Sequence, residues 1–309
     1  MKSMFLIALM AWSTLVFAEK YQFNVINIEY FEDEESYLVF ASNGLVYSVK
    51  SDKEDVLSAL NEARETDLAV TVSLRVDSAF KDLRNEYPEI SKVEFGELMT
   101  IESPKSNSLK GLEDFTDSDL TPLSDYKVTE LSDMDSAQRL FDTMRTRTRR
   151  RSQCYNRAHI WNYEMWRYQG RKMTGKMWIF FTSRYIKKYK YKWWFHVAPY
   201  VEVAGQDEAV VLDREFSRSP QLRTDWKNDY MKNNWNCPEV TKYSDYRNNQ
   251  WSNDCYLIQS SMYYWQPINL KTLEEEGVQK KFFVDGEVSR AYRNGFRRRS
   301  LDEDGIVLD

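Results

Sequence analysis

The hydrophobic and polar positions divide the chain into a short apolar start and two regions with folding patterns. The run from Met4 to Phe17 is nearly unbroken apolar sequence after the basic Lys2. Val16 and Ala18 are small enough for a signal peptidase site, so we predict a signal peptide over 1–18, cleaved after Ala18. The run is shorter than the roughly 20 apolar residues that span a bilayer, and an uncleaved anchor is the alternative.

The next region combines strand and helix patterns in a short span. Four runs have strand or hairpin character through alternation, turn signals or β-branched content. They are residues 21–30, 37–49, 68–74 and 90–98. Between them, apolar residues at helical spacing predict a helix from Ser51 through Ala63, with Ser51 as its cap. We therefore predict a small α+β domain over residues 19–101.

Periodicity is lost after this domain and then returns. Residues 102–135 begin with Ser, Asp, Pro, Lys and Gly in no regular order, which predicts a linker. The remainder, 136–309, is predicted to be a second domain. Its patterns are a helix over 133–143, a helix from Ser152, a strand over 177–181, a hairpin formed by 193–203 and 209–213, and a helix over 284–296.

Charge separates the two regions further. Residues 19–135 hold 27 Asp and Glu against 11 Lys and Arg, a net charge of -16, whereas residues 136–309 carry +10. All three Cys and both His also lie after residue 135. Regions this different in charge are expected to attract each other at low salt. We predict that the acidic domain covers the basic one.

A run of arginines opens the second region. Arg145, Arg147, Arg149, Arg150 and Arg151 lie within seven positions. The run is either a solvated or phosphate-contacting face, or a site where an activating protease separates the two domains. A nucleic-acid partner is disfavoured, since the chain is acidic overall and the run is isolated.

Cys154 follows at the predicted start of a helix, with Ser152 as the expected cap. A thiol there faces unpaired backbone N–H groups and the positive end of the helix dipole, which favour thiolate and can bind an oxyanion. The alternative is a buried structural cysteine. Cys237 and Cys255 could close a loop of about 17 residues, worth roughly 3 kcal/mol in an oxidising compartment. That pairing would leave Cys154 without a disulfide partner, although other pairings of the three cysteines stay open.

The predicted hairpin brings a histidine and an aspartate together. His196 lies on its first strand and Asp213 at the end of its second, and a catalytic imidazole needs such a carboxylate to orient it. Cys, His and Asp in this layout suit nucleophilic acyl transfer. His159 lies five residues beyond Cys154, which turns it away from the thiol, so we predict a structural role. No metal or organic cofactor is implied.

These residues resemble a known family. Cys154-Tyr155-Asn156-Arg157-Ala158-His159 resembles the Cys-x-x-Arg-Ala-His motif of bacterial protein-glutaminases. Trp194 to Pro199 resembles their Trp-Tyr-His-Val-Ala-Pro strand, and Val211-Leu212-Asp213 their Val-Ile-Asp element. Order and spacing agree over about a fifth of the chain. Arg214 departs from the pattern, because the family tends to have Pro after the Asp.

The resemblance implies an exported proenzyme whose N-terminal domain blocks the active site. It implies an α+β fold with a papain- and transglutaminase-like core, in which the nucleophile helix packs on an antiparallel sheet. Cys154 would be the nucleophile, His196 the general base and acid, and Asp213 the orienting residue. The activity would be deamidation of accessible glutamine side chains in proteins. Secretion or export to the periplasm follows from the signal peptide, with no membrane association after cleavage.

Three aromatic residues near His196 are candidates for the substrate slot. Trp193, Trp194 and Tyr200 could form its walls, or could equally be core aromatics. The same triad could instead transfer the acyl group to lysine, as a transglutaminase does, or cleave peptides as a cysteine protease. A non-catalytic exported binding protein is the alternative from another class.

Overall fold

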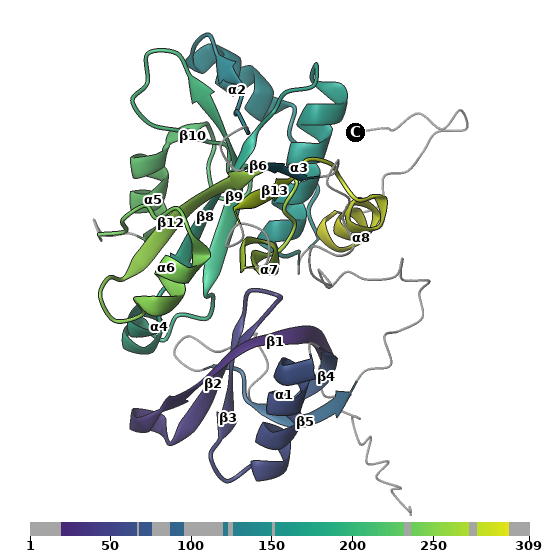
Figure 1. Cartoon of the computed structure of the whole chain (residues 1–309), viewed down its shortest axis with the longest axis vertical. Coiled ribbons are helices and arrows are strands. Elements are labelled where there is room, and N and C mark those ends of the chain that lie inside the picture. Colours follow the sequence, from purple (N-terminus) through teal and green to yellow (C-terminus); the bar gives the residue numbers. More distant parts are fainter. Residues whose placement is uncertain are drawn as a thin grey trace, which may run out of the picture.

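A computed structural model of the chain describes residues 20–66, 68–75, 87–95, 120–122, 126–149, 152–231, 236–271 and 277–296. The predicted signal peptide, most of the predicted linker, Arg150 and Arg151 lie outside these residues. The described part forms two α+β units that lie one above the other along the long axis (Figure 1). The α+β class predicted from the sequence is confirmed.

The N-terminal unit is an antiparallel sheet covered by one helix. Its strands run in the order β3-β2-β1-β4-β5. The elements are β1 (Lys20–Phe31), the 3-10 helix η1 (Glu32–Glu34), β2 (Ser36–Ala41), β3 (Val46–Lys50), α1 (Glu54–Thr66), β4 (Ala69–Leu74) and β5 (Ile90–Phe95). The predicted hairpin turn joins β2 to β3. The helix begins at Glu54 rather than at Ser51, so the predicted cap is wrong.

Burial explains why these elements form. Val56, Leu60 and Ala63 lie on one face of α1 and are buried against the sheet. Every second residue of β4 is buried, as alternation predicts for a strand with one face on a core. The unit has a hydrophobic core of its own, which Tyr47 and Leu60 occupy at 0% exposure.

The second unit is centred on a sheet in which β9 has neighbours on both sides. The main order is β11-β10-β9-β8-β12, and β7 pairs with β9 in parallel. The strands are β7 (Glu130–Leu131), β8 (Gly175–Phe181), β9 (Phe195–Val203), β10 (Val210–Val211), β11 (Gln221–Leu222) and β12 (Cys255–Ser261). Every residue of β8 is buried, which explains its continuous run of apolar and aromatic side chains.

Helices cover this sheet, and a pair of short strands closes the unit. The helices are α2 (Met134–Asp142), α3 (Cys154–Tyr168), α4 (Ser183–Tyr189), α5 (Arg223–Met231), α6 (Tyr243–Asn248), α7 (Pro267–Asn269) and α8 (Asp285–Gly295). The short strands are β6 (Leu120–Pro122) and β13 (Val278–Lys280), which pair antiparallel. Helix α3 packs on β9, so the predicted helix on an antiparallel sheet is confirmed.

The segment predicted as a linker contributes to the second unit. Strands β6 and β7 both lie within 102–135 and pair with β13 and β9. Tyr126 donates a hydrogen bond from its hydroxyl to the Thr174 carbonyl at 2.6 Å. The residues from 120 onward that the structure describes therefore belong structurally with the second unit, while the domain boundaries stay a prediction.

Several contacts join the units directly. Leu45, in the turn between β2 and β3, forms an antiparallel bridge with Trp193, and the Trp194 N–H donates to the Gly44 carbonyl at 3.1 Å. The Trp194 indole N–H donates to the Ala41 carbonyl at 2.8 Å. A second contact joins η1 to α4 through an ion pair between Glu34 and Lys190. The units thus meet beside the start of β9.

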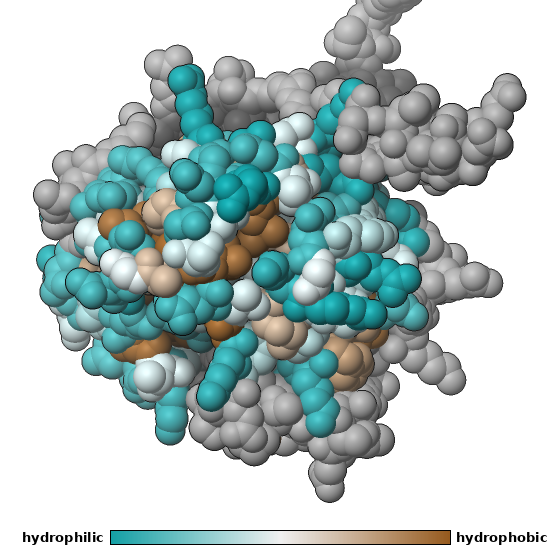
Figure 2. All heavy atoms as spheres, turned by 90° about the horizontal axis from the view of Figure 1, so that it is seen from above, coloured by the Kyte–Doolittle hydropathy of each residue, from teal (hydrophilic) through white to brown (hydrophobic). Residues whose placement is uncertain are grey.

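The surface fits the charge-rich composition. Seen from above, most of the described surface is hydrophilic, and apolar side chains show in patches toward the centre (Figure 2). Within the described ranges, no helix combines the length and the apolar character needed to cross a membrane.

Candidate active site

Helix α3 places Cys154 at its first residue. Gln153 is the residue before the helix, and its side chain makes no capping hydrogen bond. The predicted cap, Ser152, is therefore wrong. The first N–H groups of α3 lack intrahelical partners, as at the start of any helix. Cys154 is 5% exposed and is the free cysteine of the described chain.

His196 and Asp213 come from neighbouring strands of the sheet. Val210 and Val211 of β10 pair with Val201 and Tyr200 of β9, which brings the end of β10 beside the middle of β9. His196 Nε2 lies 2.6 Å from Asp213 Oδ2, and both side chains are at most 3% exposed. The sequence-based prediction that these two side chains are adjacent agrees with this geometry.

The electrostatics favour a charged imidazole. Burial works against the imidazolium, but the charge and hydrogen bond of Asp213, together with Cys154, raise the pKa of His196 to about 9. Because Nε2 faces Asp213, the other ring nitrogen, Nδ1, is the one available to the thiol, with which the imidazole forms a hydrogen bond. Burial would raise the pKa of Asp213, yet His196 and the Trp226 indole hold it below its usual value.

A second set of contacts fixes the loop before Cys154. Arg157, one turn along α3, donates from Nη1 to the carbonyl and hydroxyl oxygens of Ser152. Its Nε lies 3.9 Å from Glu215 Oε2, two residues after Asp213. Arg157 therefore connects the loop that precedes Cys154 with the loop that follows Asp213.

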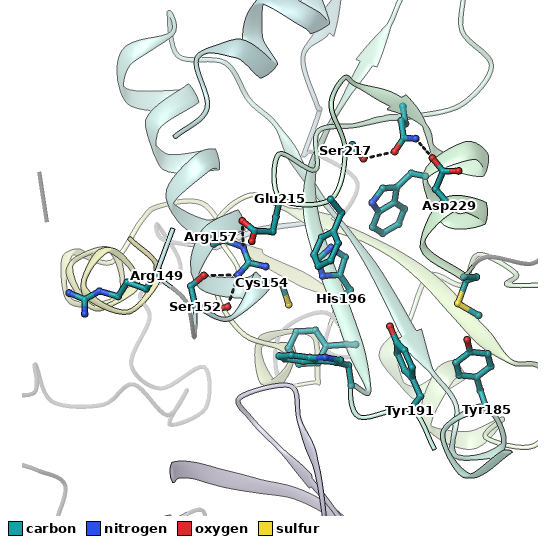
Figure 3. Close-up of a pocket in the computed structure, with 16 residues that line it drawn as sticks. Arg149, Ser152, Cys154, Arg157, Tyr185, Tyr191, His196, Glu215, Ser217 and Asp229 are labelled. Carbon is teal, nitrogen blue, oxygen red and sulfur yellow. Dashed lines mark hydrogen bonds and ion pairs between the residues drawn. The ribbon is translucent and has the colours of Figure 1, made fainter. Parts of the chain in front are cut away.

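These residues open into a cavity of about 710 Å³ (Figure 3). Cys154 and His196 face each other at one side of it, and Tyr185, Tyr191 and Asp229 lie at the other. The remaining lining residues are Arg149, Ser152, Arg157, Trp193, Phe195, Glu215, Phe216, Ser217, Gln221, Trp226 and Met231. A thiol and an imidazole on the wall of a partly apolar slot, with a buried carboxylate bound to the imidazole, can attack and release an acyl group.

The three candidate slot aromatics have different positions. Trp193 lines the cavity. Trp194 and Tyr200 are not among the lining residues, and they are 1% and 5% exposed. Trp194 is held by the Ala41 carbonyl, and the Tyr200 ring lies over Gly175. Of the three, only Trp193 is placed to contact a substrate in the cavity.

His159 lies on another face of α3, as the helical rotation predicts. Its Nδ1 is 3.0 Å from Lys176 Nζ, and both residues are fully buried. Burial lowers the pKa of each well below its usual value. Lys280 and Glu287 form a buried ion pair at 2.7 Å nearby, with Glu287 Oε2 3.9 Å from His159 Nε2. This cluster does not line the cavity.

The other two cysteines form a disulfide. Cys237 and Cys255 have Cα atoms 4.7 Å apart and are bonded, as their proposed pairing predicts. The bond ties the segment after α5 to the start of β12. Among the described residues, no group of three His, Cys, Asp or Glu side chains is placed to hold a metal ion.

Sequence patterns missed several residues of the site. Trp226, whose indole N–H donates to Asp213 Oδ2 at 2.9 Å, lies on α5, a helix with no clear apolar stripe. Glu215, Phe216 and Ser217 were missed because they follow Asp213 in an irregular loop. Proximity to Asp213 along the chain was the only available signal for them.

Comparison with known proteins gives a family match. Residues 136–230 match the model of a family described as Glutaminase, and this segment contains Cys154, His196 and Asp213. The match confirms the resemblance to the protein-glutaminases that the three motifs predict, for this part of the chain. No curated protein matches the chain.

Solved structures give weaker likenesses. A mutant of pro-protein-glutaminase, A47Q2, is 16% identical over 79% of this chain and 83% of its own, with a TM-score of 0.47. Pro-protein-glutaminase is 14% identical over 86% and 88%, with a TM-score of 0.47. The NMR structure of protein-glutaminase from Chryseobacterium proteolyticum is 13% identical over 53% and 86%, with a TM-score of 0.33. Scores this low carry no argument by themselves.

Proposed function

Because residues 136–230 belong to the glutaminase family, we propose that this chain is a cysteine-dependent protein-glutamine glutaminase. Its reaction is hydrolysis of the glutamine carboxamide to glutamate and ammonia. The observation that carries the proposal is that Cys154 and His196 line one cavity and that Asp213 binds His196 from behind it, all within the matched segment. The residue roles below are part of the proposal.

The first half of the reaction forms a thioester. The Cys154 sulfur attacks the carboxamide carbon, and the oxyanion accepts hydrogen bonds from N–H groups at the start of α3. His196, held as imidazolium by Asp213, gives its proton to the departing nitrogen. The C–N bond breaks and ammonia leaves. Asp213 keeps the imidazole oriented and remains ionised.

The second half hydrolyses the thioester. Water enters the position that ammonia vacated and loses a proton to the now neutral His196 as it attacks the acyl carbon. The C–S bond breaks, the thiolate is restored, and glutamate is released. Lysine in place of water would give an isopeptide bond, and a peptide bond in place of the carboxamide would give proteolysis. Both reactions are outcomes of the test.

We also propose that the N-terminal unit keeps the enzyme inactive until it is removed. Its turn at 42–45 contacts Trp193 and Phe195, two residues that line the cavity. A side chain at Gly44 would lie 3.3 Å from both rings, so the turn is packed tightly against that wall. A protein substrate would have to reach the cavity past this same wall. The signal peptide over 1–18 makes export the proposed location.

We propose that the activating cleavage occurs outside the arginine run. Arg145 is ion-paired with Glu164, and its carbonyl accepts the Trp161 indole N–H at 2.9 Å. Cleavage there would detach β7 and α2 from the second unit. Cleavage between β5, which ends at Phe95, and β6, which begins at Leu120, would release the N-terminal unit alone.

The decisive experiment measures ammonia release from a glutamine-rich denatured protein. The full chain is assayed before and after limited proteolysis, with Cys154→Ser alongside. Amine is first omitted and then added. We expect release after proteolysis without amine, and none from Cys154→Ser. A variant with unchanged circular dichroism shows that loss of activity is not loss of fold.

Other results would replace the proposal. Release only with amine would indicate a transglutaminase, and a cleaved substrate would indicate a protease. An intact substrate with no ammonia under any condition would indicate a binding protein.

A further inference from the structure

We propose that Trp226 is a positioning residue of the catalytic site, which fixes the Asp213 carboxylate against His196 by sharing its Oδ2 oxygen. The inference rests on the proposed function, because it assigns Trp226 a part in that reaction. Trp226 would act through Asp213 and His196 and not on the reacting atoms.

The contacts around Asp213 carry the argument. Two donors from different elements bind the same oxygen: His196 Nε2 of β9 at 2.6 Å and Trp226 Nε1 of α5 at 2.9 Å. The other oxygen, Oδ1, is buried and has no hydrogen-bond partner in the described part of the chain. The carboxylate is therefore oriented through one oxygen, which both donors share.

The indole also shields the pair. Trp226 is 1% exposed, and its ring lies 5.9 Å from the His196 ring at an interplanar angle of 31°. It lines the cavity beside the imidazole. The apolar face of the ring therefore helps to keep the hydrogen bond between Asp213 and His196 out of water.

Helix α5 holds the indole in this position through its first turn. The Arg223 N–H donates to the Ala209 carbonyl at 2.9 Å. The Thr224 N–H and hydroxyl both donate to Glu208 Oε2, at 3.1 and 2.7 Å. Ala209 and Glu208 precede β10, which leads to Asp213. Because α5 and Asp213 are anchored to the same short segment, their separation is fixed.

The shared oxygen has a chemical consequence. The indole N–H draws charge from Oδ2 and so moderates the attraction of the carboxylate for the imidazolium. His196 must give a proton to the departing nitrogen and later take one from water. Such a group works best when neither its protonated nor its neutral form is strongly stabilised. The other ionisable groups here are Arg157, whose charge also stabilises ionised Asp213, Glu215 beside Arg157, and the Cys154 thiol.

Removal of the N–H should therefore raise the pKa of His196 above its value of about 9. The imidazolium would be held more firmly, and the thioester would be hydrolysed more slowly. We expect kcat to fall roughly tenfold, the effect of one hydrogen bond to a charged group, with little change in KM.

The chain suits a direct test because it has only two histidines. Ring-labelled histidine would give two sets of NMR signals in the full chain, and His159→Gln would assign them. The pH titration of His196 is compared in the unsubstituted chain, in Trp226→Phe, and in a chain with benzothienylalanine at position 226. The last keeps the shape of the indole and removes only the N–H. Trp251→Phe, at an exposed tryptophan outside the cavity, is the matched control.

We expect a higher pKa of His196 in both Trp226 variants and an unchanged pKa in Trp251→Phe. We also expect the fall in kcat of the Trp226 variants after proteolysis. An unchanged or lower pKa would overturn the proposal, as would a raised pKa with unchanged kcat. The titration needs no turnover. If every form fails to release ammonia, the proposed function fails, and the titration alone decides the role of Trp226.

Discussion

Gly175 and Tyr200 face each other across β8 and β9, where they are register partners. A Cβ atom built on Gly175 would lie 2.1 Å from a Tyr200 ring carbon, closer than any van der Waals contact allows. The absence of a side chain at 175 is thus what lets the Tyr200 ring lie flat on the sheet, four residues from His196. A single glycine decides how closely β8 and the aromatic side of β9 can pack.

This contact predicts opposite effects for two glycine substitutions. Gly175→Ala should destabilise the fold by about 1–3 kcal/mol, because the ring or a strand must move. Gly295→Ala is the control: its Cβ would meet Asn156 at an ordinary 3.5 Å, and alanine favours the helix by up to about 1 kcal/mol. Thermal unfolding of both variants checks this. Equal midpoints for the two would contradict it.

At the scale of elements, α8 supports the nucleophile helix. Its C-terminal residues hold the segment before Cys154, since the Arg149 N–H donates to the Gly295 carbonyl at 2.9 Å. The Trp265 indole N–H, in the loop before α7, donates to Asn156 Oδ1 at 3.0 Å in the first turn of α3. Tyr292 of α8 donates to Glu164 at 2.7 Å near the other end of α3.

The buried ion pair between Lys280 and Glu287 joins β13 to α8, and its contribution to the stability of the fold can be measured. Glu287→Gln should cost about 3 kcal/mol, because it leaves a buried ammonium without its counter-charge. Glu94→Gln, in an exposed pair with Lys20, should leave the unfolding midpoint unchanged. Chemical denaturation of both variants tests the difference. Replacement of both buried partners by Met and Leu should recover most of the loss, and failure to recover would mean that the charges are needed for more than each other.

Elements with a regular pattern were predictable from sequence. The helix over 133–143 corresponds to α2 with Asp133 as its cap, and the helix over 284–296 to α8. The hairpin that carries His196 and Asp213 was predictable because two largely apolar runs flank a polar turn. These features depend on neighbours along the chain, which a sequence displays directly.

Elements that depend on distant partners were not predictable. Strand β12 pairs with β8 across some 80 positions, and Trp226 reaches Asp213 from a helix with weak periodicity. Lys176 ends a stretch of basic and glycine residues in the sequence but is fully buried, where it contacts His159 and donates to the Tyr264 carbonyl. Its environment is formed by β8, α3 and the segment before α7, which are distant in sequence. No local sequence pattern could therefore predict it.

At the scale of the whole molecule, the two units meet through the turn at Gly44, through ion pairs, and through a buried hydrogen bond from the Tyr87 hydroxyl to the Ile186 carbonyl at 2.7 Å. The turn at Gly44 is apolar and packs on the cavity wall, whereas the Lys190–Glu34 and Lys187–Glu29 pairs lie outside it. Ion pairs exposed to solvent contribute little and weaken with salt. The turn should therefore contribute most of the inhibition, and salt alone should relieve only part of it.

Gly44→Ala separates these contributions. Gly44 has a φ of +89°, and an alanine there would also press on Trp193 and Phe195, so the uncleaved chain should release ammonia several-fold faster. Gly205→Ala is the matched control, since Gly205 has a φ of +78° but its Cβ would meet open space. Ammonia release by both uncleaved variants is the measurement. If Gly44→Ala is as inactive as the parent, the turn does not block the cavity.

The pairing of β6 with β13 and the packing of α8 on α3 have a consequence for the order in which the chain is synthesised and completed. A ribosome delivers Cys154, His196 and Asp213 well before residues 278–295, yet these last elements close the unit and hold the segment before the thiol. Chains truncated before α8 would carry every reacting group and lack the support that aligns them. Synthesis thus supplies the proposed inhibitory unit first and the last support of α3 at the end, so under the proposed function an unfinished chain would be doubly unable to attack the proteins around it.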